Sequence, residues 1–353
     1  RQQNNKYIAL FLILEGLLLG VFCAFDSILF YIFFEAMLIP LFLIIGIWGG
    51  PNRVYATIKF FIYTLLGSVL MLAALLYLSF KANSFYILDY YNLVLSLDTQ
   101  ILIFLAFLIA FGIKVPMWPV HTWLPDAHVE APSSGSVILA AVLLKVGGYG
   151  MIRFLLPITP DAGFYLNNFL IPLSLVAIIY ISFVAIAQQD MKKLIAYSSI
   201  AHMGFVTLGI FLVFNTIGQA QDIQNISHIG LQGAIMQMLS HGLISAGLFI
   251  CIGIIYSRTK SRMIDDQSGI GQVMPVFSAL MMFFLLANSG LPGTSGFVGE
   301  FMVLIAAIKN NIMYAVLAST TLVLAASYSL WLGKRGLFGE VNNDNVASMK
   351  ILR

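Results

Sequence analysis

The sequence has few charged residues and very few cysteines. Lys, Arg, Asp and Glu make up 9% of its 353 residues and 60% are hydrophobic, whereas a soluble domain carries about 25% charged residues. Cys23 and Cys251 lie in separate apolar stretches, and no CxxC pair or His/Cys cluster could hold zinc, haem or an iron–sulfur centre. Glycine-rich nucleotide-binding motifs are absent, and the net charge of +3 is too small to indicate nucleic acid. We therefore expect a polytopic protein of the lipid bilayer, with no cofactor, metal or nucleic-acid site of its own.

Ten apolar stretches are long enough to cross a membrane as helices. A hydrocarbon core about 30 Å thick requires about 20 apolar residues per helix. On this measure the spans cover approximately 7–25, 27–48, 57–80, 99–128, 133–156, 165–188, 193–214, 230–256, 273–308 and 311–333. We predict an all-α polytopic membrane protein, in which residues 1–353 form a single membrane domain.

Proline and glycine interrupt two of these spans, the fourth and the ninth. The interrupting segments are IKVPMWPVHTWLP and NSGLPGTSGF. Each belongs to the fourth helix in a group of five, which predicts two inverted five-helix repeats at about 1–156 and about 165–333. Broken helices at corresponding positions of two repeats are typical of transporters, and their unwound backbone must line a cavity or be buried in protein.

Lysine and arginine are unevenly distributed over the predicted loops. Only Lys81, Arg153 and Lys309 fall on one side, and all of the other loop cations fall on the opposite side. The positive-inside rule places the cation-rich side in the cytoplasm, or in the matrix of a mitochondrion. Because the chain begins with Arg1 and ends in the polar segment VNNDNVASMKILR, we interpret it as an internal portion of a longer protein.

Three charged residues lie well inside the spans of the first predicted repeat. Lys114 ends the run ILIFLAFLIAFGIK, Lys145 follows SGSVILAAVLL, and Glu35 lies in SILFYIFFEAMLIPLFLIIG. A lysine near the bilayer centre costs about 2.5–3.5 kcal/mol on insertion scales, so such residues usually have a function. We expect Glu35 to pair with Lys114 and to change its proton affinity; the alternative is a static ion pair. Lys145 is either an interior residue of closely packed helices or a lysine that snorkels to a helix end.

The second predicted repeat carries two histidines and a glutamate in its apolar helices. His202 lies in IAYSSIAHMGFV, His241 in MQMLSHGLISAG and Glu300 in GFVGEFMVLIAAI. Imidazole exchanges protons near neutral pH, so the histidines either relay protons or are simply hydrogen-bonded in the core. Glu300 follows the second helix break much as Lys114 precedes the first, and its apolar surroundings favour a functional role over helix capping.

The insert after Lys114 adds polar residues that either form a proton port or, as loop residues, cap the next helix: His121, Asp126, His128 and Glu130. Lys59 is interpreted as a snorkelling residue or a contact to lipid headgroups. Glu15 has either a function or a place at a helix contact, and His228 has no assigned role.

Several of these segments together resemble the antiporter-like subunits of respiratory complex I, NADH:quinone oxidoreductase. They extend over nearly the whole chain and include FYIFFEAMLIPLFLIIGIWGG, IKVPMWPVHTWLPDAHVEAP, SVILAAVLLKVGGYGMIRF, DMKKLIAYSSIAHMGFV, MLSHGLISAGLF and LPGTSGFVGEF. Glutamate at position 300 resembles the M type, called chain 4 in mitochondria, because the L and N types mostly carry lysine there. Family members have fourteen helices, so the chain would correspond to helices four to thirteen.

The resemblance implies that the chain is a translocase subunit that moves protons while electrons pass from NADH to quinone. Other subunits would bind NADH, FMN, the iron–sulfur clusters and quinone, and the L-type and N-type subunits would be among the partners. The family pattern also implies a proton pathway in which Glu35 modulates Lys114 and a central polar axis leads to a terminal site. The residues of that pathway would be Glu35, Lys114, Lys145, His202, His241 and Glu300.

Two related functions share this helical core and remain alternatives. One is a subunit of a multisubunit sodium/proton antiporter, and the other is the membrane arm of an energy-converting hydrogenase. A scaffold without conduction would explain neither the buried charges nor the two broken helices. The LPDAH form and the polar loop at 215–229 favour a bacterial cytoplasmic membrane over the mitochondrial inner membrane.

Overall fold

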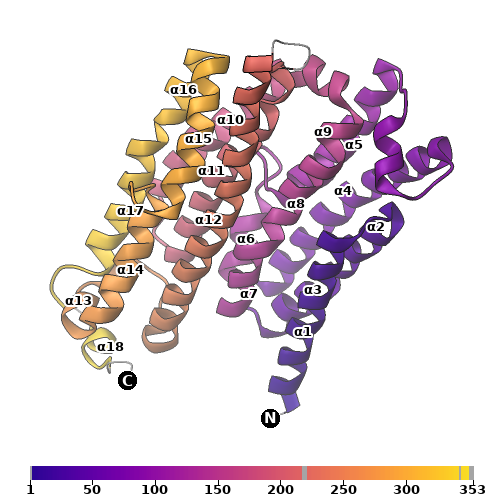
Figure 1. Cartoon of the computed structure of the whole chain (residues 1–353). Helices are drawn as coiled ribbons and strands as arrows, with labels where there is room; N and C mark the ends of the chain where they lie inside the picture. Colours follow the sequence, from indigo (N-terminus) through magenta and orange to yellow (C-terminus); the bar gives the residue numbers. More distant parts are fainter. Residues whose placement is uncertain (1, 217–220, 342, 350–353) are drawn as a thin grey trace. The chain divides into compact units, whose positions relative to one another are not determined.

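Helices account for almost all of the regular structure in the computed structural model, which describes residues 2–216, 221–341 and 343–349 (Figure 1). No strand occurs within these residues. Nine of the described helices are long and apolar enough to cross a membrane, or ten if one bent pair counts as a single span. The predicted all-α polytopic membrane fold is therefore confirmed.

The chain forms two compact units. The first comprises residues 1–135 and 142–170, and the second comprises 136–141 and 171–353. Apolar side chains cover the exposed faces of the long helices in both, for example Leu19, Leu102 and Leu243, which are 60%, 70% and 71% exposed. An apolar surface of this kind requires hydrocarbon rather than water around it.

The first unit is built from helices whose ends follow local sequence signals. Asp26 accepts hydrogen bonds from the backbone N–H groups of Ile28 and Leu29 and so caps the second helix. The span at 27–48 is interrupted at Met37, between the second and third helices. Pro40 follows this point and has no N–H to donate to the preceding turn. The helices are α1 (Gln2–Cys23), α2 (Ser27–Ala36), α3 (Leu38–Trp48), α4 (Arg53–Ala82), η1 (Ile87–Asn92), α5 (Leu97–Lys114), α6 (Trp123–Glu130), α8 (Leu144–Gly150), η3 (Met151–Leu155) and α9 (Leu156–Ile158).

The first helix break lies where the sequence predicts it. α5 ends at Lys114, and α6 does not begin until Trp123. Pro116 and Pro119 lie in the gap, where neither can donate the backbone hydrogen bond that would continue the helix. The Trp118–Pro119 peptide bond is cis.

Three elements have residues in both units: α7 (Ser133–Ile138), the π-helical turn η2 (Leu139–Leu143) that follows it, and α10 (Pro160–Ile186). The remaining elements belong to the second unit. They are α11 (Met191–Phe211), η4 (Phe214–Thr216), α12 (Gln221–Thr259), η5 (Asp265–Gln267), α13 (Ile270–Val273), α14 (Pro275–Asn288), α15 (Ser295–Asn310), α16 (Ile312–Ser319), α17 (Thr321–Gly336) and α18 (Asp344–Ala347).

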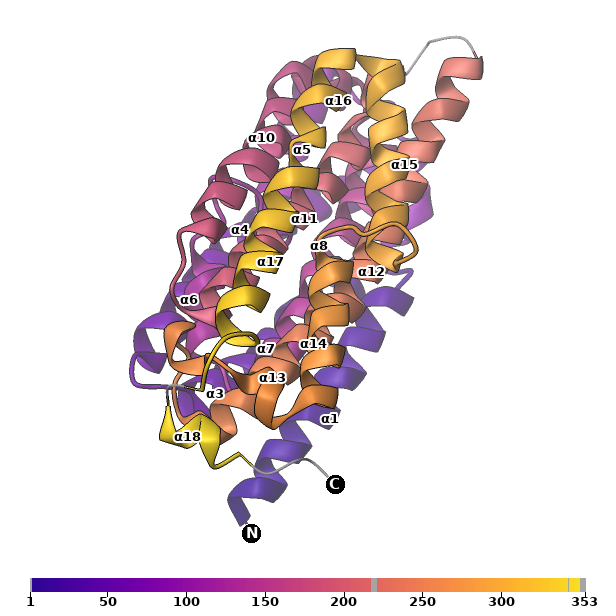
Figure 2. The same cartoon turned by 90° about the vertical axis from the view of Figure 1, so that its left-hand side faces the viewer.

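The second unit contains the second break, between α14 and α15. Gly290 and Gly293 have φ angles of 72° and 93°, in the left-handed region that glycine adopts without strain. Pro292 between them lacks a donor, so the helix cannot continue. α14 packs against α17 and α15 packs against α16, as both views show (Figures 1 and 2).

One predicted boundary is wrong. The sequence predicts a polar loop at 215–229. Residues 217–220 lie outside the described part of the chain, and from Gln221 onward the segment is helical, because α12 begins there. Polar residues such as Gln221 and Asn225 occur in the first turns of α12 because a long helix can extend beyond the apolar core of a bilayer.

Candidate functional site

Lys114 occupies an aromatic chamber in the first unit. Its side chain is completely buried at the last residue of α5, and its Nζ lies 4.8 Å from the ring centroid of Phe34 and 5.9 Å from that of Phe60. Nζ has no hydrogen-bond partner among the described residues. Aromatic faces attract a cation, but they accept no proton. The chamber can therefore hold the amine in either protonation state.

Glu35 lies close enough to Lys114 to interact with it electrostatically. It projects from α2 and also interacts with Ser68 of α4. No direct ion pair joins Glu35 to Lys114 in the described chain, so a gap separates the two charges. The structure thus brings the predicted pair together at a distance where each charge influences the other without a direct contact.

Lys145 lies on α8, between two π-helical turns. Its side chain is buried, with 8% exposure, which removes the expectation that it snorkels to a helix end. Gly147 brings α8 against α5, because a Cβ at this position would lie 2.7 Å from the Phe111 carbonyl oxygen. The predicted close helix contact at the glycines after Lys145 is confirmed.

We expect Gly147→Ala to weaken this packing, because a methyl group would meet backbone atoms that cannot move aside. Overpacking of this kind costs ~1–3 kcal/mol. The matched control is Gly16→Ala, where a Cβ meets nothing within 4 Å. Thermal stability of the detergent-solubilised assembly that contains the chain would report the difference. Equal melting temperatures for the two variants would contradict the close contact.

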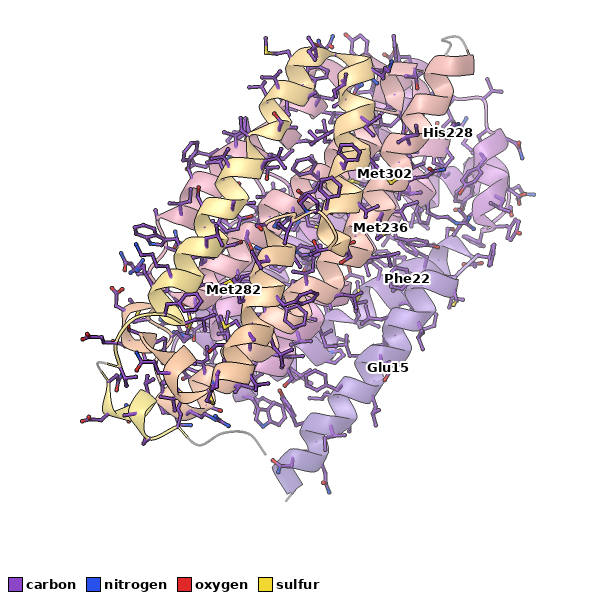
Figure 3. The ribbon with its side chains drawn as sticks, turned by 60° about the vertical axis from the view of Figure 1, so that its left-hand side comes forward. Glu15, Phe22, His228, Met236, Met282 and Met302 are labelled. Atoms are coloured by element: carbon purple, nitrogen blue, oxygen red, sulfur yellow. The ribbon has the colours of Figure 1, made fainter. Side chains whose placement is uncertain are left out.

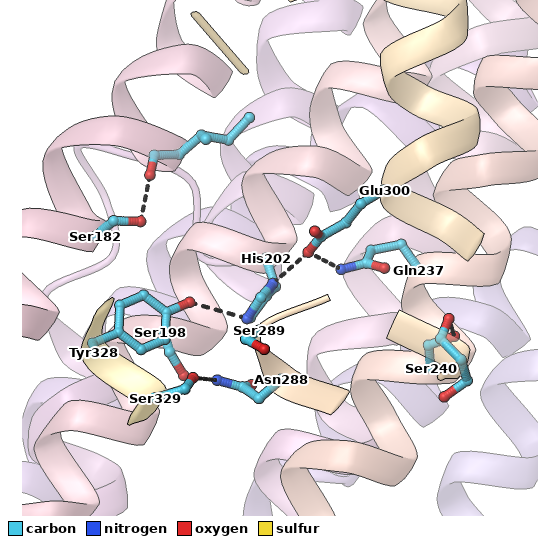
Figure 4. A network of polar contacts seen from close by, with 12 residues as sticks. Ser182, Ser198, His202, Gln237, Ser240, Asn288, Ser289, Glu300, Tyr328 and Ser329 are labelled. Carbon is cyan, nitrogen blue, oxygen red and sulfur yellow. Dashed lines mark hydrogen bonds and ion pairs between the residues drawn. The ribbon is translucent and has the colours of Figure 1, made fainter. Parts of the chain in front are cut away.

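A continuous hydrogen-bonded group lies in the second unit (Figure 4). Glu300 Oε1 lies 2.8 Å from His202 Nδ1 and accepts a 3.0 Å hydrogen bond from Gln237 Nε2. On the other side of the imidazole, Tyr328 OH lies 3.1 Å from His202 Nε2. The His241 ring centroid lies 5.8 Å from that of His202. All of these side chains are buried.

The backbone of α15 lets Glu300 reach this position. A Cβ at Gly299 would lie 2.6 Å from the Gln237 backbone nitrogen, so only glycine allows α15 to approach α12 so closely. Gly290, in the break, would place a Cβ 3.0 Å from Glu300 Oε2. The carboxylate is therefore enclosed by the histidine, the amide and the unwound segment.

This arrangement suits proton exchange. A distance of 2.8 Å between an imidazole nitrogen and a carboxylate oxygen is within the range for direct transfer. When Glu300 is ionised it accepts from His202 Nδ1–H, and a neutral His202 then accepts from Tyr328 at Nε2. When Glu300 is protonated, its O–H can donate to Nδ1 instead.

The polar residues after the first break occupy different positions from those predicted. Asp126, His128 and Glu130 lie on α6 rather than in a loop, because the helix resumes at Trp123. Lys59 pairs with one of them, because its Nζ lies 2.7 Å from Asp126 Oδ2.

His121 in the turn before α6 and His128 on it are both buried. Glu15 and His228 are exposed on α1 and α12 (Figure 3). Within the described ranges, no group of three or more His, Cys, Asp or Glu could hold a metal ion.

Sequence reasoning missed three polar side chains in these sites: Ser68, Gln237 and Tyr328. Each is a common polar residue within an apolar span, in KFFIYTLLGSVL, GAIMQMLSHG and AASYSLWL. Burying a single hydroxyl or amide group costs less free energy than burying a charge. Such residues therefore stand out less in an apolar sequence. Only their contacts with Glu35, Glu300 and His202 distinguish them.

Ionisable side chains buried inside interrupted membrane helices define a polytopic protein of the ion-translocating type. The chain belongs to the transmembrane family described as NADH:quinone oxidoreductase/Mrp antiporter, whose model matches residues 24–325.

Similar proteins come from both bacteria and mitochondria. The chain is 50% identical to NADH-quinone oxidoreductase subunit M of Rhodobacter capsulatus, over 98% of this chain and 67% of that protein. It is 47% identical to NADH-ubiquinone oxidoreductase chain 4 of Marchantia polymorpha, over 96% and 66%. A chain of respiratory complex I from Thermus thermophilus has the same fold, with a TM-score of 0.89 and 35% identity over 98% of this chain and 71% of that one. The chain thus spans about two thirds of the length of the relatives it matches.

Proposed function

We propose that this chain is a proton-translocating membrane subunit of NADH:quinone oxidoreductase, of the M type. The observation that carries the proposal is the buried contact between His202 and Glu300, at 2.8 Å within a membrane span. Burying a carboxylate in an apolar span is costly and requires compensation. The hydrogen bond to His202 offsets the cost of burying the Glu300 carboxylate, and the same contact allows the pair to exchange a proton.

The proposed route passes through both units. A change at Glu35 alters the proton affinity of Lys114, which gives its proton to Lys145; His202 and His241 carry it on to Glu300. Water would bridge gaps that side chains do not. His121, Asp126, His128 and Glu130 mark the side on which protons enter. NADH, FMN, iron–sulfur clusters and quinone belong to other subunits, so this chain supplies binding and movement of protons and no redox chemistry.

The predicted inverted repeats, at about 1–156 and about 165–333, fit this route. In each repeat the broken helix would hold the side chain that binds the proton, Lys114 in the first and Glu300 in the second. We further propose that the chain lies beside the L-type and N-type subunits, which would carry corresponding routes. A subunit of a sodium/proton antiporter remains the second candidate, because the family model covers both kinds of protein.

Proton pumping by membranes that carry the intact complex tests the proposed function. We expect Lys145→Ala to reduce NADH-driven proton uptake and coupled NADH:quinone turnover by at least about tenfold, because a positioned proton carrier contributes a hundredfold or more. NADH oxidation by a water-soluble artificial acceptor should continue. The control is Lys81→Ala, an exposed lysine in the last turn of α4. Unchanged NADH-driven pumping in Lys145→Ala, with the complex assembled, would show that these protons do not pass through Lys145 and would reject the proposed route.

A further inference from the structure

One face of α6 is fastened to α4 by polar contacts that recur every fourth residue. Residues spaced by four lie on one face of a helix; here they begin at Thr122, the N-cap of α6, and their partners run in the opposite order along α4 to its N-cap, Asn52. The three pairs are the Thr122 and Tyr63 hydroxyls at 3.0 Å, the Asp126 carboxylate and Lys59 amine at 2.7 Å, and the Glu130 carboxylate and Asn52 backbone N–H at 2.9 Å.

The first residue of α6 closes the chamber of Lys114. Trp123 is completely buried and donates a 2.9 Å hydrogen bond from Nε1 to the carbonyl oxygen of Ile113, the neighbour of Lys114 in sequence. Its ring lies 5.2 Å from that of Phe60, which in turn lies 5.9 Å from Lys114 Nζ. Movement of the start of α6 would therefore displace the aromatic wall that lies beside the amine.

The two ends of α6 are held differently. At its last residue the Glu130 carbonyl accepts a 2.9 Å hydrogen bond from the Gly50 N–H, in addition to the side-chain contact with Asn52. Towards its start, the polar contacts to α4 are the Asp126–Lys59 ion pair and a single hydroxyl contact. The ion pair lies partly at the surface of the chain, where the Asp126 and Lys59 side chains are 32% and 20% exposed. Contacts to the α4 side thus hold the end of α6 through backbone groups and its first half through charge, in addition to the hydrogen bond of Trp123 to Ile113 at its start.

We propose that the Lys59–Asp126 ion pair is a latch that keeps the start of α6 closed over Lys114. Lys59 and Asp126 are positioning residues: they control access to the chamber and do not themselves carry the proton to Lys114. The importance of this access for pumping rests on the proposed function, whereas the latch itself is a property of the fold.

A cysteine on the buried part of α6 reports whether the latch is closed. Ala127 follows Asp126 and is completely buried, so Ala127→Cys in a Cys23→Ser background should react slowly with N-ethylmaleimide in the solubilised intact complex. Mass spectrometry of the labelled peptide separates this reaction from labelling of other subunits. We expect Asp126→Asn or Lys59→Met to raise the labelling rate about two- to fivefold, as loss of a partly exposed ion pair should. The reversed pair Lys59→Asp with Asp126→Lys should restore slow labelling.

The matched control is Asp265→Asn, which removes a different partly exposed ion pair, to Arg335 in the second unit, and should leave labelling at Ala127→Cys unchanged. Proton uptake per NADH oxidised should fall in the variants that label faster and should recover in the reversed pair. Labelling that does not change when the pair is broken, or a reversed pair that labels as fast as Asp126→Asn, would overturn the latch. Because labelling does not depend on pumping, these outcomes are distinct from failure of the proposed function.

Discussion

Replacing Lys114 by alanine is expected to abolish proton pumping by the complex and to reduce coupled turnover by about two orders of magnitude or more. The substitution removes a buried amine in an aromatic chamber and the charge with which Glu35 interacts. Proton uptake by inverted membrane vesicles on addition of NADH measures the first effect, and rotenone-sensitive NADH:quinone activity measures the second. Assembly is checked by native gel electrophoresis, because the deletion also leaves a cavity.

Lys114→Arg separates a proton carrier from a static ion pair. Arginine keeps the positive charge but does not release its proton at any physiological pH. A proton carrier at position 114 requires that release, so the arginine variant should pump as poorly as the alanine variant. Near-normal pumping with arginine would mean that Lys114 only balances the charge of Glu35.

Glu300→Gln is expected to have an effect of similar size, again about two orders of magnitude. Glutamine has nearly the same shape and can still contact His202 and Gln237, so packing in the second unit should be preserved. It cannot bind and release a proton, and the exchange at 2.8 Å with His202 Nδ1 is lost. Pumping should therefore fail in an assembled complex, as vesicle proton uptake would show.

Glu15→Gln supplies the control for this substitution. Glu15 also lies on a long apolar helix, and its side chain is exposed on α1. The same chemical change there should leave pumping within about twofold of the parent, because exposed positions contribute little. If Glu15→Gln and Glu300→Gln pumped equally well, Glu300 would not be the terminal proton site.

Sequence alone was sufficient for the two helix breaks because their signals are local. Proline at 116, 119 and 292 removes backbone donors, and glycine at 290 and 293 permits the left-handed backbone that ends α14. The buried charges were equally visible, since a lysine or glutamate inside an apolar span stands out against its neighbours. The start of α12 was missed because polar residues in a helix that extends past the bilayer resemble a loop.

The partners of those charges depended on the tertiary structure. Asp126 and Lys59 are 67 residues apart, and His202 and Glu300 are 98 residues apart, so no spacing along the chain reveals either pair. The same holds for Tyr328, whose place beside His202 depends on how α17 packs in the second unit.

The sequence by itself thus determined the membrane class, the approximate spans, the interrupted helices and the residues that carry ionisable groups, because hydrophobic length and backbone donors are properties of short segments. The tertiary structure alone decided that Glu35 approaches Lys114 without a direct ion pair, that Lys59 pairs with Asp126, and that His202 joins Glu300 to Tyr328. These contacts depend on how closely the helices approach and on which of their faces meet. Glycines such as Gly147 and Gly299 permit the close approach, but its effect appears only when segments distant in sequence pack together.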